Sequence, residues 1–455
     1  MIGLNKIGLN QVQLNRLRLN APFPAYGKMA GGGGSGDGFP QLPGDVTRWH
    51  FGGLTNEMMA AMDDPRIEDA DGKGRFLSFK NFAWKEGSGI SDIYPGALVF
   101  DGVDDWAGCD NLPLLPKEKG YSIIALRNWI TRYDATQYKR PLISNLGTND
   151  EGAFLIEYRK DENVNDVTGS YNSFTDVYID DNNPITWQTS SSYNGQIIKK
   201  GTSKSTNKLC ICKTYFGQLS NYANAAIWEI VILDHDATEE ELTKIKDYFV
   251  KTYPWLFPDQ AWTVTGKTNE DEDRATIANI TGNGNDLVLS NFGFAEGSGY
   301  NEEGEYAGYL VTDGVDDMIT SSAFNIGKDF TIVGDWKFID NKKSGTGLVK
   351  GSSFYIYNTM IGLDLYINSG SVKNSLDGIK SINAACSDGR AYDRNWNEIL
   401  ANTGNVVGSG GTLEVSSSGG RFDRIAFKNL AIYPRILSKE DCIKAYNYLQ
   451  TLKAK

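Results

Sequence analysis

The amino-acid sequence predicts an all-β protein with two similar β-sandwich domains, each closed by one C-terminal helix, behind an extended N-terminal arm. Three observations support this prediction. Glycine accounts for 50 of 455 residues, and the chain has 10 Trp, 23 Tyr and 20 Phe. Glycine at about 11%, against an average of ~7%, together with many aromatic residues favours short strands joined by tight turns. In addition, most of the sequence is an internal duplication, and its first twenty residues form a short repeat.

The N-terminal arm begins with four five-residue repeats, each with an aliphatic residue, a spacer, Leu and Asn. The aliphatic positions switch parity between repeats, so neither a helix nor one flat strand would place them all on one face. Four repeats form too small a core to be stable alone, so we expect this arm to anchor the protein to a partner or to copies of itself. A flexible Gly-rich linker ends the arm, which spans residues 1–38. The expected anchoring residues are Ile2, Leu4, Ile7, Leu9, Val12, Leu14, Leu17 and Leu19.

Three motifs recur in the same order in the second half of the chain. They are Thr55–Glu57 with Thr268–Glu270, Glu86–Gly89 with Glu296–Gly299, and Asp101–Asp105 with Asp313–Asp317. Their order predicts the same fold twice, with loops of different length. Because Pro254 and Pro258 follow a predicted helix, the boundary is placed beside them. The first sandwich is predicted over residues 39–258 and the second over 259–455.

Each copy contains strand patterns and ends with one helix. Runs rich in β-branched and aromatic residues predict strands at 122–126, 154–158 and 227–233 in the first copy, and at 329–338, 353–357 and 425–433 in the second. Thr238 with Glu241 three residues later predicts a capping box at the start of the first helix. Ser438 with Asp441 approximates the same arrangement in the second.

Several of these segments resemble laminin-G-like, concanavalin-A-like domains. Leu430–Asp441 looks like their closing strand and helix start, and Val99–Asp105 resembles their early strand-turn-strand. Tyr193–Gly195 resembles their late hairpin turn, from which Tyr392–Arg394 in the second copy departs. The resemblance covers residues 45–255 and 260–455. It implies two tandem concanavalin-A-like jelly-roll β-sandwiches, and binding of glycans or protein surfaces more often than catalysis.

Charge and composition argue against several kinds of function. The chain has 45 basic and 57 acidic residues, for a net charge of −12, which argues against a nucleic-acid or anionic membrane partner. Only two histidines, His50 and His235, are available for catalysis or zinc binding. The five scattered cysteines indicate reduced thiols, and neither an export signal nor a membrane-spanning segment is visible. We therefore expect synthesis in a reducing cytoplasm.

The acidic turns Asp101–Asp105 and Asp313–Asp317 allow two interpretations. Clustered carboxylates suit Ca²⁺, and some members of the resembling family bind that ion. Alternatively, Asp101 and Gly102 form a turn while the other carboxylates face solvent. Because Ca²⁺ requires about six or more oxygen ligands and only three carboxylates are evident locally, we favour the turn and predict no metal and no cofactor.

Catalytic carboxylates are the next possibility, because glycoside hydrolases occur on the resembling fold. Their mechanism requires two carboxylates about 5–9.5 Å apart across one sugar bond. The resembling hydrolases place them on one strand face as Glu-x-Asp-x-(x)-Glu, and the nearest run here, Glu157–Glu162, has the wrong spacing. Neither histidine lies near a nucleophile-elbow serine. The sequence therefore predicts no catalytic residues and a protein that is not an enzyme.

The tryptophans are candidates for stacking on sugar rings. Most are expected in the core, because β-sandwiches bury aromatic side chains between their sheets. Trp187 and Trp396 lie among polar residues. We therefore predict these two as ligand-binding side chains.

Taken together, these features predict a structural virion protein, either a tailed-phage fibre or an appendage attached to the capsid or tail. The arm would contact other virion proteins, and the sandwiches would bind a host-surface glycan or a neighbouring virion protein. Three arms sharing one core would make a homotrimer. The predicted localisation is the virion, after synthesis in the host cytoplasm. Two alternatives stay open: a bacterial surface or secreted carbohydrate-binding protein, and a glycoside hydrolase on the same fold.

Overall fold

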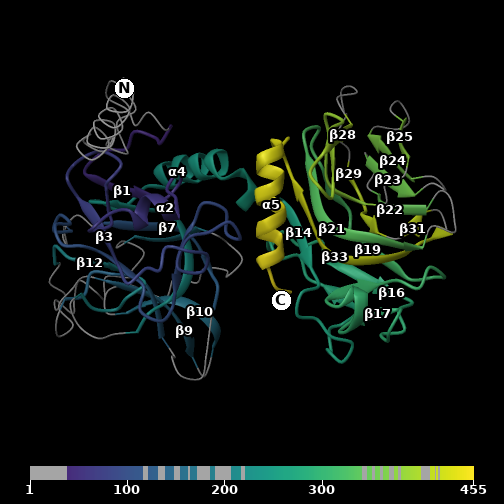
Figure 1. Cartoon of the computed structure of the whole chain (residues 1–455), viewed down its shortest axis with the longest axis horizontal. Helices are drawn as coiled ribbons and strands as arrows, with labels where there is room; N and C mark the ends of the chain where they lie inside the picture. Colours follow the sequence, from purple (N-terminus) through teal and green to yellow (C-terminus); the bar gives the residue numbers. More distant parts are fainter. Residues whose placement is uncertain are drawn as a thin grey trace, which may run out of the picture. The chain divides into compact units, whose positions relative to one another are not determined.

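The computed structural model contains two compact units of antiparallel β-sheet (Figure 1). It describes residues 38–115, 121–131, 139–147, 154–161, 164–171, 185–189, 206–216, 221–340, 346–350, 354–358, 362–367, 373–377, 381–400, 410–415, 417–418 and 421–454. The first unit holds the described residues up to Ser91 and Gly96–Phe249. The second holds Asp92–Pro95 and the described residues from Val250 onward. The domain boundaries predicted from the sequence stay predictions.

The first unit is built from two sheets. One sheet has the order β11-β7-β13-β5-β4, with β1 also paired to β13. Its strands are β11 (Ile185–Thr189), β7 (Ser122–Trp129), β13 (Asn224–Leu233), β5 (Leu98–Asp101), β4 (Gly89–Ile90) and β1 (Val46–His50). The other sheet has the order β10-β9-β8-β12-β6-β3-β2. Its strands are β10 (Val164–Tyr171), β9 (Leu155–Asp161), β8 (Lys139–Ser144), β12 (Leu209–Ile211), β6 (Trp106–Cys109), β3 (Phe76–Lys80) and β2 (Arg66–Glu68). A short helix, α2 (Asn56–Ala60), follows β1.

The second unit repeats this plan. Its first sheet has the order β17-β18-β33-β21-β26-β27-β28, with β14 paired to β33. These strands are β17 (Gly299–Asn301), β18 (Tyr309–Val311), β33 (Arg424–Tyr433), β21 (Thr331–Asp340), β26 (Ile382–Cys386), β27 (Ala391–Asp393), β28 (Glu398–Leu400) and β14 (Gln260–Thr263). Its other sheet has the order β15-β16-β19-β30-β22-β23-β24-β25. These strands are β15 (Thr276–Ile277), β16 (Leu287–Ser290), β19 (Met318–Ser321), β30 (Glu414–Val415), β22 (Thr346–Lys350), β23 (Phe354–Asn358), β24 (Gly362–Ile367) and β25 (Lys373–Asp377).

Smaller elements complete the second unit. Two-stranded pairs form between β20 (Phe324–Asn325) and β29 (Gly410–Gly411), and between β31 (Ser417–Ser418) and β32 (Arg421–Phe422). Single turns of 3₁₀-helix lie at η2 (Pro254–Leu256) and η3 (Gly304–Tyr306).

A hydrophobic core lies between the two sheets of each unit. In the first unit, Leu77 and Phe79 of β3 and Ala107 of β6 contribute to the core, while Phe76 and Lys80 are exposed. This alternation is expected for a strand with one buried face and one solvated face. In the second unit, core side chains likewise come from both sheets, Ile319 of β19 and Ile432 of β33 among them. The predicted all-β fold of two sandwiches is confirmed, whereas the predicted N-terminal arm lies outside the described residues.

A helix closes each unit, as predicted, at α4 (Glu239–Thr252) and α5 (Lys439–Thr451). At α4 the capping box forms in full: the Glu241 amide donates to Thr238 Oγ1 at 3.2 Å, and the Thr238 amide donates to Glu241 Oε2 at 2.8 Å. At α5 the Asp441 amide donates to Ser438 Oγ at 3.0 Å. Figure 1 shows α5 alongside β21 and β33.

Helix α4 covers the outer face of the sheet that contains β13. Arg48 Nη1 of β1 lies 2.9 Å from Glu229 Oε1 of β13, and both side chains are buried. The Tyr248 hydroxyl of α4 donates to Glu229 Oε2 at 3.3 Å and accepts from Arg48 Nη1 at 3.1 Å. Nine of the ten residues of β13 are buried, which means that both of its faces are covered. On the other sheet, Phe76 and Lys80 at the two ends of β3 are exposed.

Candidate ligand-binding surface

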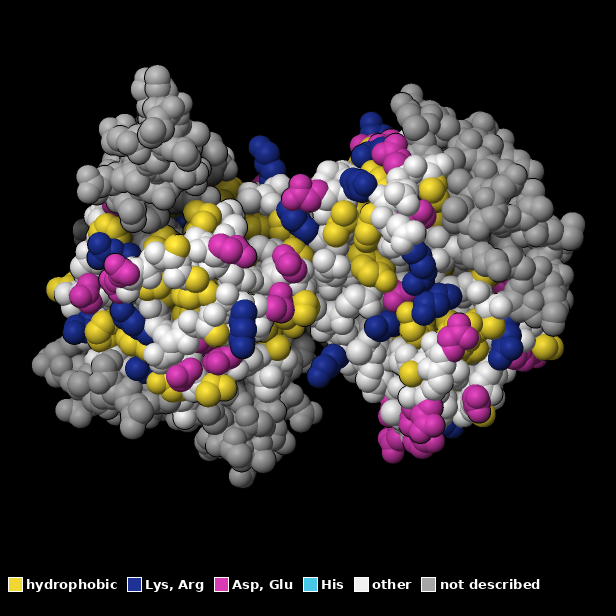
Figure 2. All heavy atoms as spheres, in the orientation of Figure 1, with side chains coloured by type: hydrophobic (Ala, Val, Ile, Leu, Met, Phe, Trp, Pro, Cys, Tyr) yellow, Lys and Arg dark blue, Asp and Glu magenta, His cyan; other side chains and the backbone are white. Residues whose placement is uncertain are grey.

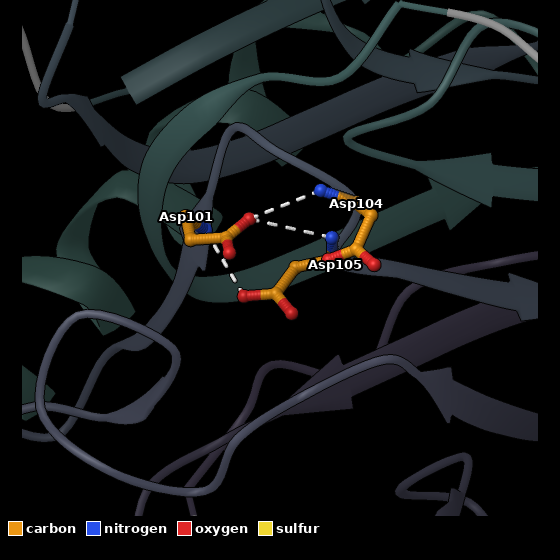
Figure 3. Close-up of side chains that lie close together, drawn as sticks. All are labelled: Asp101, Asp104 and Asp105. Carbon is orange, nitrogen blue, oxygen red and sulfur yellow. Dashed lines mark hydrogen bonds between the residues drawn. The ribbon is translucent and has the colours of Figure 1, made fainter.

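The first acidic turn is held together by its own carboxylates (Figure 3). Asp101 Oδ1 accepts hydrogen bonds from the amides of Val103 at 2.7 Å and of Asp104 at 3.3 Å. The same oxygen lies 3.4 Å from the Asp105 amide, while Asp105 Oδ2 accepts from the Asp101 amide at 3.0 Å. Each end of the turn thus binds the other, which is the expected behaviour of Asp at a tight turn.

The second acidic turn repeats these bonds. Asp313 Oδ1 accepts from the Val315 amide at 2.7 Å, and Asp317 Oδ2 accepts from the Asp313 amide at 2.7 Å. The Ser298 hydroxyl adds a bond to Asp317 Oδ1 at 3.1 Å. In both turns one oxygen from each of the three carboxylates lies within 4.8 Å of the others, a spacing that a cation could bridge. The bonds that these oxygens already accept support the interpretation of both segments as turns, but the expectation that the other carboxylates face solvent is wrong for Asp105 and Asp317, which are buried.

Burial changes the ionisation of the last aspartate in each turn. Asp105 and Asp317 are both fully buried. Desolvation raises the pKa of each carboxyl from 3.8 to about 6, against the opposing effect of the hydrogen bonds that it accepts. These two carboxyls therefore change charge near neutral pH.

The Thr55–Glu57 motif and a further repeated pair, Asn81-Phe82 with Asn291-Phe292, also make structural bonds. The Asn81 side chain donates to the Asp104 carbonyl at 2.9 Å, which ties the acidic turn to the segment after β3. Asn56 bonds both backbone groups of Ile90, donating to the carbonyl and accepting from the amide, each at 2.8 Å. The same bonds recur in the second unit through Asn291 and Asn269. The residues shared by the two copies therefore hold the chain in place, and a function specific to one copy has to come from residues that differ.

The first unit carries an aromatic cluster on the outer face of its β6-containing sheet. Since Ala107 and Cys109 point into the core, strand alternation directs Trp106 to the outer face. Phe216 meets Trp106 edge to face, with ring centroids 5.7 Å apart. A Cβ atom on Gly108 would lie 2.6 Å from the Trp106 ring, so the missing side chain makes room for the indole. Both aromatic side chains are half-buried.

Two lysine ammonium groups lie over these rings. Lys213 Nζ is 4.1 Å from the centroid of Trp106 and 5.7 Å from that of Tyr222. Lys208 Nζ is 4.6 Å from the centroid of Phe216. Lys213 is only 6% exposed, and burial lowers the pKa of its ammonium group. We call Trp106, Lys208, Lys213, Phe216 and Tyr222 the aromatic–lysine surface.

The second unit lacks this surface at the equivalent register positions. Strand β19 pairs with β30 as β6 pairs with β12. Where the first unit has Trp106, Gly108 and Cys210, the second has Met318, Thr320 and Glu414. The two copies thus share their turns and cores but differ on this face.

The structure places the predicted ligand-binding tryptophans in different settings. Trp187 lies in β11, and its side chain is outside the described part. Trp396 lies in the β27–β28 turn with φ of +63° and packs edge to face against Tyr446 of α5, with centroids 5.6 Å apart. The eight predicted anchoring residues and the Tyr193–Gly195 turn lie outside the described residues. The roles assigned to all of these residues stay predictions.

The lysines of the aromatic–lysine surface were not predicted from the sequence. Simple alternation after Leu209 and Ile211, which point into the core, would also place Lys213 inside. Cys212 adopts φ of +58°, a left-handed conformation that is uncommon for a non-glycine residue. This interrupts the alternation and brings Lys213 over Trp106. No local sequence signal identifies such a conformation at cysteine.

On the face drawn in Figure 2, the described surface is mixed in charge. Figure 2 shows acidic and basic side chains interspersed over both units on the face in view. No helix in the described part of the chain has the length and apolar character needed to cross a membrane.

Comparisons with known proteins give structural likenesses only. No family model matches the sequence, and the curated proteins give no match. A mutant Trypanosoma rangeli sialidase with trans-sialidase activity is 9% identical, with a TM-score of 0.29; the match covers 50% of this chain and 42% of that one. Domain 4 of AbnA, an extracellular arabinanase from Geobacillus stearothermophilus solved with arabinotriose, is 12% identical, with a TM-score of 0.29 and coverage of 42% and 98%. The botulinum neurotoxin serotype D binding domain is 10% identical, with a TM-score of 0.28 and coverage of 82% and 94%.

These matches correct one prediction. Several of the similar structures are Trypanosoma rangeli sialidases. The prediction that this chain is not an enzyme excluded catalysis, and it is therefore wrong. That exclusion depended on the absence of one carboxylate spacing, and a short sequence pattern does not represent every way of placing catalytic groups on a β fold. At these TM-scores the likenesses do not establish catalysis, and they do not identify what the chain binds.

Proposed function

We propose that the chain is a carbohydrate-binding protein and that its first sandwich binds glycan through the aromatic–lysine surface. The observation that carries this proposal is the cluster of half-buried rings beside two ammonium groups on the outer face of the β6-containing sheet. Ligand sites typically combine aromatic surface with a few placed polar groups. Aromatic rings can pack against the C–H face of a sugar, and lysine ammonium groups can donate hydrogen bonds to its oxygens.

The arrangement of the two sheets supports this choice of surface. Helix α4 covers the outer face at β13, where Glu229 is fully buried. On the other sheet, Lys80 at the end of β3 is exposed and pairs with Trp106, so the outer face is exposed beside the aromatic–lysine surface. The acidic turns are less suitable, because one oxygen each of Asp101, Asp105, Asp313 and Asp317 already accepts a backbone amide of the turn.

Glycan-array binding of the full chain tests the proposal, with Trp106→Ala as the test variant. We expect at least a tenfold loss of affinity for the bound glycan, equivalent to ~1.4 kcal/mol. Trp187→Ala and Trp396→Ala are the matched variants, because each removes one indole elsewhere. Circular dichroism checks that each variant folds. Loss of binding in either matched variant but not in Trp106→Ala would place the site elsewhere and contradict the proposal.

We further propose that the N-terminal arm attaches the protein to a virus particle, either as a fibre or as a head or tail appendage, and joins three copies. The pentad repeats and the Gly-rich linker of residues 1–38 support this proposal. Deleting residues 1–38 should leave folded sandwiches that are monomeric by light scattering and no longer sediment with particles. Unchanged assembly after the deletion would contradict the anchoring role.

A further inference from the structure

We infer that the aromatic–lysine surface selects acidic saccharides, whose carboxylate or sulfate group would lie against Lys213 and Lys208. This inference rests on the proposed function and specifies its ligand class. Its basis is a buried cation for which the described part of the chain gives no anionic partner, on a chain with a net charge of −12.

Lys213 differs from the other buried cations for which the structure gives a partner. Lys267, whose side chain is 4% exposed, lies 2.6 Å from an Asp273 carboxylate oxygen. Arg48, which is fully buried, lies 2.9 Å from Glu229. Lys213, in contrast, has two aromatic rings around its ammonium group and no hydrogen bond or ion pair to it among the described residues. Cation–π contact compensates for only part of the lost hydration of an ammonium group.

The second ammonium group strengthens the argument for an anion. Lys208 and Lys213 lie over two rings whose centroids are 5.7 Å apart, so both cations flank the same small area. A neutral sugar could accept hydrogen bonds from both, but it would leave their mutual repulsion unchanged. A carboxylate or sulfate would reduce that repulsion and restore an anionic partner to Lys213.

The desolvation of Lys213 is a further reason to expect an anionic ligand. Burial lowers the pKa of Lys213, because the charged ammonium form is less well solvated there than in water. A bound anion favours the charged form, so it raises this pKa, and binding is linked to protonation of Lys213. Affinity for acidic saccharides should therefore decline at alkaline pH, through the range in which Lys213 loses its proton.

The test compares oligosaccharides that differ only in charge, measured by calorimetry on the full chain. The probes are tetrasaccharides of one hexose, its uronic acid and its sulfate ester. The expected result is at least tenfold tighter binding of an acidic probe than of the neutral one. The uronate and sulfate arms show which anion fits better.

Lys213→Met should abolish most of this preference, measured in the same variant as the ratio of the affinities for the acidic and the neutral probe. Lys208→Gln, at an exposed position where folding is not at risk, should reduce the preference about threefold. The matched control is Lys337→Met, because Lys337 Nζ lies 4.5 Å over the Tyr309 ring in the second unit. We expect no change in this variant.

The outcomes separate this inference from the proposed function. Equal or tighter binding of the neutral probe, with loss in Trp106→Ala, would overturn the acidic preference and leave glycan binding at this surface intact. An acidic preference that survives Lys213→Met and Lys208→Gln would also overturn the inference. No binding of any probe or array glycan would overturn both.

Discussion

Replacing Asp105 by Asn should remove part of the pH dependence of stability in the first unit. Asp105 is fully buried, and its Oδ2 accepts the Asp101 amide at 3.0 Å. Asn keeps an oxygen acceptor for that amide but cannot ionise. The substitution therefore keeps the hydrogen bond to the Asp101 amide and removes the free-energy cost of burying a negative charge.

The sign follows from the raised pKa. The carboxyl has a pKa of 3.8 when exposed and about 6 in the folded protein, mainly because of desolvation. The folded state thus holds this proton more tightly, so its contribution to stability is complete below about pH 3.8 and is lost as the pH rises through about 6. A difference of about two pH units corresponds to ~3 kcal/mol at most. Solvent screening near the turn reduces this, so we expect about 1–3 kcal/mol.

Urea unfolding of the full chain at pH 4, 5, 6, 7 and 8 measures the effect. Between pH 4 and 8, Asp105→Asn should gain ~1–3 kcal/mol of unfolding free energy relative to wild type. Asp317→Asn should do the same for the second unit, where the pKa is also raised to about 6. Asp104→Asn, at an exposed position in the same turn, is the control.

A free-energy difference between wild type and Asp105→Asn that stays constant from pH 4 to 8 would refute this reasoning. Calcium provides a second check. If millimolar Ca²⁺ stabilised wild type but not Asp105→Asn, the turn would be a metal site and the structural interpretation would be wrong.

Two further predictions concern stability. Gly89→Ala should cost about 1–3 kcal/mol in urea unfolding, because its Cβ would lie 2.3 Å from Asn56 Oδ1. Gly327→Ala, with open space at that position, should change stability by less than about 0.5 kcal/mol, and equal effects of the two substitutions would contradict the steric argument. Glu229→Ala should cost about 3–5 kcal/mol in the same assay, because it leaves Arg48 buried without its carboxylate partner. A loss below about 1 kcal/mol would show that this ion pair is dispensable.

The sequence predicted the sandwich fold because its signals are local. The apolar run at Ile227–Leu233 lies in the central strand β13, and Thr238 and Glu241 cap the helix at the expected residues. The turn at Asp101 follows from an Asp-Gly pair. Each of these features depends on neighbours within a few residues, which a single sequence contains.

The candidate surface could not be predicted in the same way, because it joins residues from separate strands. Trp106 and Lys213 are far apart in the sequence and meet only through the pairing of β6 with β12. The left-handed conformation of Cys212 then decides which face Lys213 occupies. Trp396 stood out among polar neighbours, but its contact with Tyr446 depends on the distant helix α5.

The bonds of Asn56 and Asn269 to the strand after each Glu-Gly-Ser-Gly segment have a consequence for how the two halves could diverge. After a gene duplication, these hydrogen bonds would keep both copies folded while the outward-facing residues of a sheet were replaced. A chimaera that carries Trp106 and its neighbours on the second scaffold should therefore still fold. If glycan binding moved with the transplanted residues, binding would depend on that sheet face and not on the rest of the domain.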